Sequence, residues 1–329
     1  MKILDLSIKP GPPLHFQKPL PVKENTVTEK KTLLLEIHLE KDQQTVSLTA
    51  EISLLENYSL YNQRDIIESF NKIKDQLDKI DLASAVDLAT TLKMPTPLIH
   101  ALEVIKFKSL NLSEHQPIKA RALNDYKSNA FKLKISKKNL SEIFENLKEH
   151  SSNGNQIQVT LDANQQLDQE DWNEFFEAYK TWNNSKNIQL IVEEPLTFEE
   201  LAKDNFYQKF DEQNIQIAVD EGLPQWYFQG LNEKEIYKRL SLYGNIVFKP
   251  GMLTLSQVED IMKNSDHITP QNVFLSCLYD GPWNLAYFFY ISSKLNLSQP
   301  AGLSPLMNIE ENATYLQLNE SKEIISLLK

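Results

Sequence analysis

Five charged residues recur at a nearly constant interval along the chain, each at the end of a short apolar segment. They are Lys134, Asp162, Glu193, Asp220 and Lys249. The successive separations are 28, 31, 27 and 29 residues (162 − 134, 193 − 162, 220 − 193 and 249 − 220). One strand with the helix that returns the chain occupies roughly 30 residues. The spacing therefore predicts repeated βα units, each presenting one charge at the carboxyl end of its strand.

The apolar segments that carry these charges alternate with longer amphipathic segments between residues 111 and 309. The strand-like runs are 118–123, 130–135, 156–162, 187–193, 215–220, 244–249, 272–276 and, more weakly, 299–304. Such alternation favours an α/β fold, a TIM-like barrel of seven or eight βα units. An open doubly wound sheet fits the same pattern. Neither GxGxxG nor GxxxxGK[ST] occurs, so the nucleotide-binding forms of that sheet lose their usual motif.

The first 110 residues read as a separate α+β domain. Residues 32–38 and 45–53 are rich in β-forming residues and flank a short polar segment, which predicts an antiparallel hairpin. Residues 63–80 and 82–93 carry apolar residues at helical spacing, and Pro95 and Pro97 end that stretch. A last strand candidate at 313–318 lies in a segment, 310–329, that we expect to return to this domain.

Composition narrows the class of partner. The net charge is −11, from 34 basic and 45 acidic residues, which argues against a nucleic acid and favours a small-molecule substrate. No apolar run approaches the roughly 18 residues of a membrane span, and the first residues lack the apolar core of a signal peptide, so we expect a cytoplasmic protein. The single cysteine, Cys277, excludes an internal disulfide and is expected to be a buried spectator. The oligomeric state stays open.

Three of the five periodic charges are carboxylates on consecutive strands. An ion at the end of an apolar strand is costly unless it meets a partner, so Asp162, Glu193 and Asp220 indicate a shared cation. Oxygen ligands suit a hard ion, so Mg²⁺ is favoured and Mn²⁺ is the natural substitute. Each carboxylate alone could instead cap the helix that follows its strand. Lys132 and Lys134 are two residues apart on one strand, so their side chains share a face.

Five short motifs occur in order at this spacing. They are Lys-x-Lys in FKLKIS (131–136), LDAN (161–164), VEEP (192–195), VDE (219–221) and FKP (248–250). With these motifs the chain resembles the enolase superfamily, in its muconate-lactonizing subgroup, and within it the o-succinylbenzoate synthases. The resemblance covers nearly the whole chain and implies a TIM-like barrel with an α+β capping domain.

The resemblance also implies roles for individual residues. Asp162, Glu193 and Asp220 would bind Mg²⁺, Lys134 would be the base, Lys132 its electrostatic partner, and Lys249 the cation on the opposite face. Asn164, Glu194 and Glu221 would support the metal ligands without binding the ion themselves. Tyr58 in the capping loop 51–60, Ser276 after the seventh strand, and Gly302 on the eighth would contact the substrate, a small carboxylate.

The departures from the family pattern fall where substrate is selected. Thr160 stands where relatives often carry arginine, SCLYDGPWN (276–284) replaces a serine-rich run, and GLSP (302–305) replaces GLDT. The implied reaction is the Mg²⁺-dependent dehydration that yields o-succinylbenzoate for menaquinone biosynthesis. The alternatives are an N-succinylamino acid racemase or dipeptide epimerase, which would use Lys134 and Lys249 as opposed acid and base, and an inactive barrel that serves as a binding protein.

Overall fold

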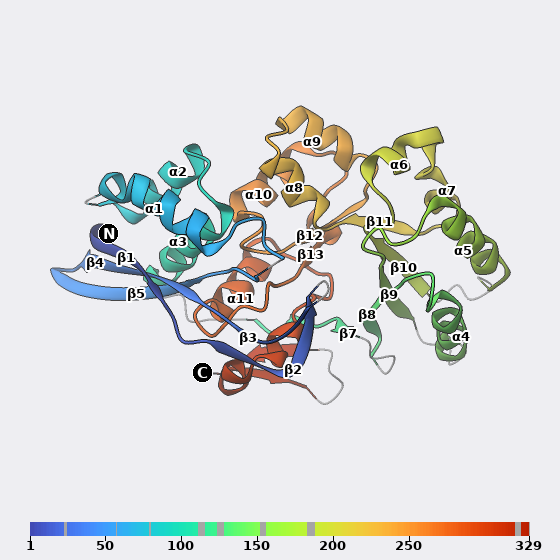
Figure 1. The fold of residues 1–329 in the computed structure, drawn as a ribbon, viewed down its shortest axis with the longest axis horizontal. Helices are drawn as coiled ribbons and strands as arrows, with labels where there is room; N and C mark the ends of the chain where they lie inside the picture. The colour runs from blue at the N-terminus through green and yellow to red at the C-terminus, as the bar shows by residue number, and fades with distance from the viewer. Residues whose placement is uncertain are drawn as a thin grey trace.

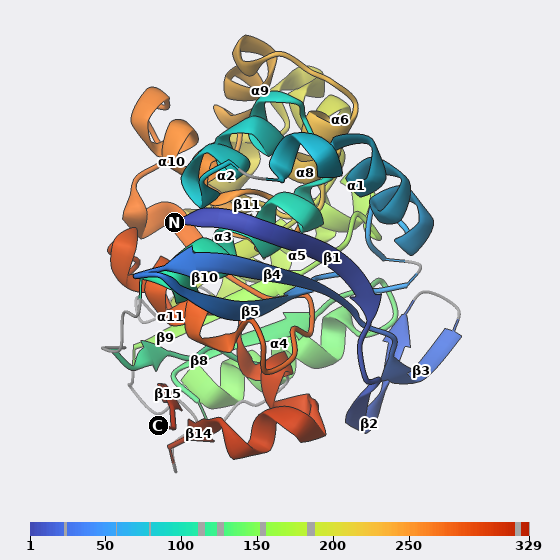
Figure 2. The same ribbon diagram turned by 90° about the vertical axis from the view of Figure 1, so that its left-hand side faces the viewer.

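The computed structural model describes residues 1–22, 25–56, 58–78, 80–110, 116–123, 128–151, 156–182, 188–319 and 324–328. An antiparallel sheet opens the chain, in the order β1 (Lys2–Pro10), β4 (Leu33–Lys41) and β5 (Gln44–Ile52). A second antiparallel pair, β2 (Leu14–Val22) and β3 (Asn25–Lys30), lies between them in sequence. The β4–β5 hairpin was predicted, whereas the β2–β3 pair was not. Figure 2 shows β1, β4 and β5 crossing the molecule beneath α1–α3.

Three helices cover this sheet, and their sequences explain their ends. In α1 (Gln63–Leu77), Asn62 and Asp65 form a reciprocal capping box, and the buried residues Ile66, Phe70, Ile73 and Leu77 form one stripe. The helix α2 spans Leu82–Thr91 and α3 spans Thr96–Ser109. We did not predict α3 because two prolines precede and enter it. Pro97 lies in the first turn, where its missing N–H has no intrahelical partner in any case.

Seven parallel strands form the second sheet, in the order β13-β12-β11-β10-β9-β8-β7. Their bounds are β7 (Ala122–Leu123), β8 (Ala130–Lys134), β9 (Ile157–Asp162), β10 (Ile188–Glu193), β11 (Gln216–Val219), β12 (Asn245–Phe248) and β13 (Val273–Leu275). Each agrees with a predicted strand, except that 118–123 divides into β6 (Ile118–Lys119) and β7. The order in space follows the order in sequence, as a barrel requires.

Residues 301 and 302 join the two edges of this sheet. Ala301 accepts a hydrogen bond from Arg121 N at 2.8 Å and donates to Lys119 O at 2.8 Å, while Gly302 N donates to Leu275 O at 2.7 Å. The weak strand predicted at 299–304 is thus present only as two parallel bridges, Ala120 to Ala301 and Ser276 to Gly302. The TIM-like barrel is confirmed, with seven regular strands and a minimal eighth.

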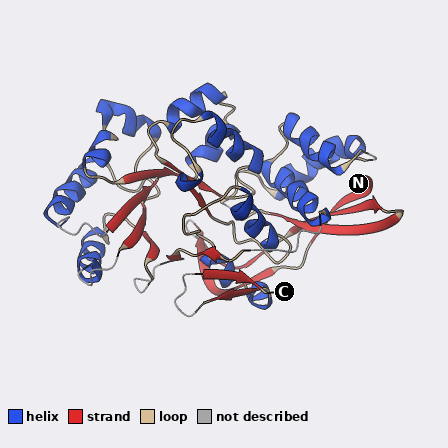
Figure 3. Ribbon diagram, turned by 180° about the vertical axis from the view of Figure 1, so that it is seen from behind, coloured by secondary structure: helices blue, strands red, loops and turns tan. Residues whose placement is uncertain are grey.

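Helices surround the barrel strands on the outside, as Figures 1 and 3 show. They are α4 (Leu140–Ser151), α5 (Gln169–Trp182), α6 (Phe198–Ala202), α7 (Gln208–Glu212), α8 (Gly222–Phe228), α9 (Glu233–Leu240), α10 (Leu255–Asn264) and α11 (Leu285–Lys294). None of the helices in the described ranges is long and apolar enough to cross a membrane.

The barrel interior is filled by a layer of apolar side chains. Ile191, Ala218, Val247 and Phe274 form a buried cluster of their own, one from each of four neighbouring strands. Side chains two residues further along a strand point to the same face. The next layer toward the carboxyl ends therefore consists of Glu193, Asp220, Lys249 and Ser276. The apolar layer seals the barrel beneath the charged one.

The chain ends against the barrel and the β2–β3 pair. The strands β14 (Leu316–Leu318) and β15 (Ile324–Leu327) form an antiparallel pair, and β15 also pairs with β6. Just before them, His15 on β2 donates a hydrogen bond from its Nδ1 to Glu311 Oε1 at 2.7 Å. The division of the chain at residues 110 and 111, with 310–329 assigned to the capping domain, stays a prediction.

A half-buried carboxylate in α3 makes stability depend on pH. Burial raises the pKa of Glu103 to about 7 from 4.5, although Leu255 N and the Tyr287 hydroxyl donate to it. The folded state therefore binds the proton more tightly, so the stabilisation present below pH 4.5 is lost as pH rises through 7. We predict that at pH 8 the free energy of unfolding of Glu103→Gln is higher than that of the wild type by on the order of 2 kcal/mol.

Urea unfolding at pH 4.5 and pH 8 checks this prediction. The matched control is Glu40→Gln, at an exposed glutamate of β4, which should follow the wild type at both values. A constant difference between wild type and Glu103→Gln across this range would show that Glu103 does not titrate on folding.

Candidate active site

The sheet register brings three of the predicted charges, Lys134, Asp162 and Glu193, to one level of the barrel. Lys134 is paired with Asp162 across β8 and β9, and Asp162 is paired with Glu193 across β9 and β10. One level lower, Lys132 is paired with Thr160, and Thr160 with Ile191. Lys134 therefore shares the level of the carboxylates, and Lys132 reaches up to them from below.

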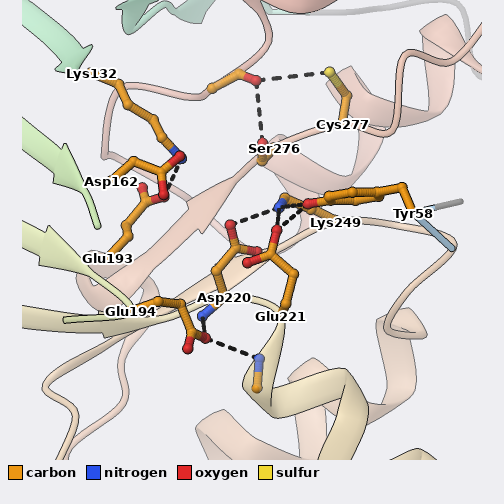
Figure 4. Close-up of polar contacts among 12 residues, drawn as sticks. Tyr58, Lys132, Asp162, Glu193, Glu194, Asp220, Glu221, Lys249, Ser276 and Cys277 are labelled. Carbon is orange, nitrogen blue, oxygen red and sulfur yellow. Dashed lines mark hydrogen bonds and ion pairs between the residues drawn. The ribbon is translucent and has the colours of Figure 1, made fainter. Parts of the chain in front are cut away.

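Lys132 joins two of the three predicted metal ligands. Its ammonium lies 2.8 Å from Asp162 Oδ2 and donates a hydrogen bond to Glu193 Oε2, as Figure 4 shows. Glu193 is fully buried and Asp162 is 7 % exposed. Burial alone would lower the pKa of Lys132, but the charges of Glu193 and Asp162 outweigh it and raise that pKa. The lysine therefore stays cationic and neutralises part of the carboxylate charge.

A second cation, Arg121, forms an ion pair with the other carboxylate oxygen of Glu193. Its Nη1 lies 2.9 Å from Glu193 Oε1 and donates to Thr160 Oγ1 at 2.8 Å. The guanidinium also lies over the Phe274 ring, 5.3 Å from its centroid. We did not predict a role for Arg121. The signal was an arginine inside the apolar strand segment 118–123, where a buried charge requires a partner.

The third carboxylate belongs to a cluster around Lys249. The Lys249 ammonium donates to Asp220 Oδ2 at 2.6 Å, to Glu221 Oε1 at 2.8 Å and to the Tyr58 hydroxyl at 2.7 Å. Tyr58 in turn donates to Glu221. Burial alone would raise the pKa of Glu221, yet Lys249 and the Tyr58 hydroxyl lower it to about 2. A capping-domain side chain thus contacts the barrel cations and carboxylates directly (Figure 4).

Glu194 holds the end of β11 in place. Its Oε1 accepts hydrogen bonds from the backbone N–H groups of Asp220 at 2.7 Å and Gly222 at 2.9 Å. Its Oε2 accepts from Gln165 at 2.7 Å. A Cβ on Gly222 would lie 3.2 Å from Glu194 Oε1, so glycine permits this close approach. Glu194 therefore orients Asp220 through the backbone, and this is how it would support that predicted metal ligand.

A buried ion pair fixes the capping loop against the barrel. Lys30 on β3 lies 2.7 Å from Glu51 on β5, and both side chains are almost fully buried. Glu51 also accepts a hydrogen bond from Gly281 N at 2.6 Å, and Lys30 donates to Tyr279 O at 3.0 Å. These contacts connect the loop that carries Tyr58 to the segment after β13.

The remaining predicted residues lie around this charged level. Lys134 is exposed at the end of β8, and Asn164 is exposed with a φ of 43°. Neither side chain makes a hydrogen bond or ion pair to another residue in the described ranges. Ser276 is half-buried, and its Oγ donates to Gly302 O at 3.4 Å. The substrate contacts predicted for Tyr58, Ser276 and Gly302 stay predictions.

The donor set suits a hard divalent cation. Asp162, Glu193 and Asp220 bring carboxylate oxygens from three adjacent strands to one edge, the ligand type that Mg²⁺ prefers. With Glu221 the cluster holds four carboxylates, which contact the three cations Arg121, Lys132 and Lys249. Within the described ranges no three acidic, histidine or cysteine side chains converge in metal-binding geometry, and Lys132 and Lys249 contact the carboxylates instead.

Solved structures identify the fold. An o-succinylbenzoate synthase from Thermosynechococcus elongatus BP-1, complexed with Mg in the active site, is 16% identical, with 93% of this chain and 94% of that chain covered and a TM-score of 0.69. The L-Ala-D/L-Glu epimerase from Bacillus subtilis is 16% identical, and the match covers 100% of this chain and 97% of that chain with a TM-score of 0.70. A dipeptide epimerase from Methylococcus capsulatus, complexed with Mg and the dipeptide L-Arg-D-Lys, is 13% identical. The match covers 100% of this chain and 98% of that chain, with a TM-score of 0.71.

These similarities confirm the resemblance at the level of fold. The chain shares the fold of these structures, a capping domain on a TIM-like barrel, and one solved structure with this fold is described as a member of the enolase superfamily. Neither the protein-family models nor the curated proteins give a match to this sequence. Since the neighbours include a synthase and epimerases, the fold alone leaves the reaction open.

We predict that Glu194→Ala destabilises the protein. The change leaves one buried and one partly buried backbone N–H group without an acceptor, which should lower the free energy of unfolding by roughly 2–5 kcal/mol. Glu194→Gln keeps an acceptor oxygen at the same place and should lose less than half of that. Urea unfolding of the three proteins measures the difference, and equal midpoints for Ala and Gln would contradict this role for Glu194.

Proposed function

We propose that the protein is an o-succinylbenzoate synthase, a Mg²⁺-dependent lyase of menaquinone biosynthesis that acts in the cytoplasm. Its substrate would be 2-succinyl-6-hydroxy-2,4-cyclohexadiene-1-carboxylate. The observation that carries the proposal is the shared level of Lys134, Asp162 and Glu193, with Asp220 and Lys249 in the neighbouring strands. A lysine, carboxylate ligands and an opposed lysine are what proton removal beside a carboxylate requires.

Asp162, Glu193 and Asp220 would hold the metal ion. The use of a lysine base with Mg²⁺ to stabilise an ene-diolate is the established pattern of enolase-superfamily sites. When bound, the ion would oppose the negative charge that develops on the substrate carboxylate as its α-proton leaves. Lys132 contacts both Asp162 and Glu193 in this structure, so it would have to release at least one of them.

Lys134 would then transfer the same proton in two steps, first from the substrate to itself and then to the leaving hydroxyl. Lys134 takes the proton from the ring carbon next to the carboxylate, and Lys249 adds positive potential from the other side. The bond from the neighbouring ring carbon to the hydroxyl breaks, and the Lys134 ammonium returns the proton to the departing oxygen. Water and o-succinylbenzoate are the products, so atoms and charge balance. Because the ring becomes aromatic, the elimination has a strong driving force.

The capping loop would shield this chemistry from water. Tyr58 places its hydroxyl against Lys249 and Glu221, and its ring lies 5.4 Å from the Lys249 nitrogen. A side chain that closes over a lysine excludes water and strengthens the electrostatic interactions inside the site. Tyr58 would thereby contact substrate bound near Lys249.

A racemase or epimerase remains the second candidate. Lys249 directly follows β12 and Lys134 ends β8, so three strands, β9 to β11, lie between them in the sheet. This opposed placement would let each lysine serve one face of a substrate α-carbon. Two of the structural neighbours are epimerases, which supports this candidate without favouring it over the synthase.

We predict that the wild type forms o-succinylbenzoate in the presence of Mg²⁺ and that chelation with EDTA abolishes turnover. Lys134→Ala should lower kcat by roughly 10²–10⁴-fold, the usual contribution of a general base. Lys137→Ala is the matched control, because that lysine is exposed and pairs with Asp171 away from the carboxylates. Absorbance at the wavelength of the diene follows the reaction.

The outcome separates the candidates. Turnover that persists in Lys134→Ala would reject the assigned base. If the wild type leaves the diene intact but exchanges the α-proton of N-succinylamino acids in D₂O, the function is that of a racemase. Neither activity in a folded, metal-loaded protein would favour a binding protein.

A further inference from the structure

Arg121 is the most deeply buried cation in the charged cluster. Its side chain is 1 % exposed, whereas that of Lys132 is 17 % exposed. Within the described ranges Glu193 is the one carboxylate within ion-pair distance of it, and its Nε makes no hydrogen bond. Burying a guanidinium costs several kcal/mol unless it is well paired, and replacing such a pair by apolar side chains often stabilises a protein. Stability alone therefore gives little reason for an arginine at this position.

The two oxygens of Glu193 have different partners. Oε1 lies 2.9 Å from Arg121 Nη1 as an ion pair without a hydrogen bond, and Oε2 accepts a hydrogen bond from Lys132. Lys132 is the more exposed and flexible of the two cations, so it can withdraw when another cation binds. Arg121 is held in place, because its guanidinium lies over the Phe274 ring, donates to Thr160 and packs against Gly302. Glu193 thus has one permanent partner and one exchangeable partner.

Gly302 provides the space that Arg121 occupies. A Cβ at position 302 would lie 3.1 Å from Arg121 Nη2 and 3.1 Å from Ser276 Oγ. Such a contact is tighter than ordinary packing, so a side chain here would push the guanidinium away from Glu193. The absence of a side chain at 302 is therefore tied to Arg121, whether or not Gly302 also contacts substrate.

We propose that Arg121 is a positioning residue for the metal site: it holds Glu193 by Oε1 so that Oε2 is presented to a divalent cation. This inference rests on the proposed metal-binding function but not on the identity of the substrate. The guanidinium also repels a nearby cation, so its removal has two opposing effects. We expect the orientation of Glu193 by Arg121 to outweigh the repulsion between the guanidinium and the metal ion, so that loss of Arg121 weakens metal binding.

Mn²⁺ binding to the full chain, measured by the loss of the free-ion electron paramagnetic resonance signal, tests the proposal without any substrate. Arg121→Met should raise the Kd by about 10- to 100-fold, as is usual when a group that orients a metal ligand is removed. Arg121→Lys keeps the charge but cannot reach both Thr160 and Glu193, so we expect an intermediate Kd. Gly302→Ala should weaken binding to a smaller extent.

Arg239→Met is the matched control. Arg239 also lies over aromatic rings, 4.5 Å from the Phe198 centroid, and pairs with Glu199 at 3.3 Å, but it is on α9 outside the barrel. Its Kd for Mn²⁺ should equal that of the wild type. A purely structural role for Arg121 would lower the melting temperature and leave the Kd of the folded protein unchanged.

Each result decides the proposal. An unchanged or lower Kd in Arg121→Met overturns it. If that variant does not fold, Arg121→Lys and Gly302→Ala decide, and wild-type affinity in both overturns it. An Arg121-dependent Kd without o-succinylbenzoate formation supports the proposal and rejects the synthase. If the wild type binds no Mn²⁺, both the positioning role of Arg121 and the proposed metal-dependent function are rejected.

Discussion

Buried negative charge at the carboxyl end of the barrel is the constraint on which the rest of the site depends. Carboxylates from three adjacent strands meet above a buried apolar layer. Such charges are tolerated only when cations pair with them. In this structure Lys132 and Arg121 divide Glu193 between them, and Lys249 holds Asp220.

The parallel register converts an even spacing in sequence into a shared level in space. Because each strand is in register with its neighbour, residues some thirty positions apart lie side by side at one edge. The capping domain then supplies what the barrel lacks. Its buried Lys30–Glu51 pair anchors the loop after β5, and this loop carries Tyr58 to Lys249. Fold and site are thus connected through a few buried polar contacts.

Much of the barrel could be predicted from sequence because its strands are apolar, short and evenly spaced. The carboxylates and lysines were visible because each one interrupts an apolar strand. Arg121 was not recognised, since its partner Glu193 lies 72 residues away (193 − 121) and only the closed barrel brings the two together. Thr160 was noted as a departure from the resembled family, and the structure shows that it accepts a hydrogen bond from Arg121. The helix α3 was missed because prolines in a first turn look the same in sequence as prolines that end a helix.

If Asp162, Glu193 and Asp220 form one divalent-metal site, the loss of any one of these carboxylates must weaken the binding of Mg²⁺. Calorimetric titration of the wild type, Asp162→Asn and Asp220→Asn with Mg²⁺ tests it most directly. The account predicts one site per chain in the wild type and affinity at least about tenfold weaker in each variant, equivalent to 1.4 kcal/mol of binding free energy. Equal affinity in the three proteins, or no binding by the folded wild type, would contradict it.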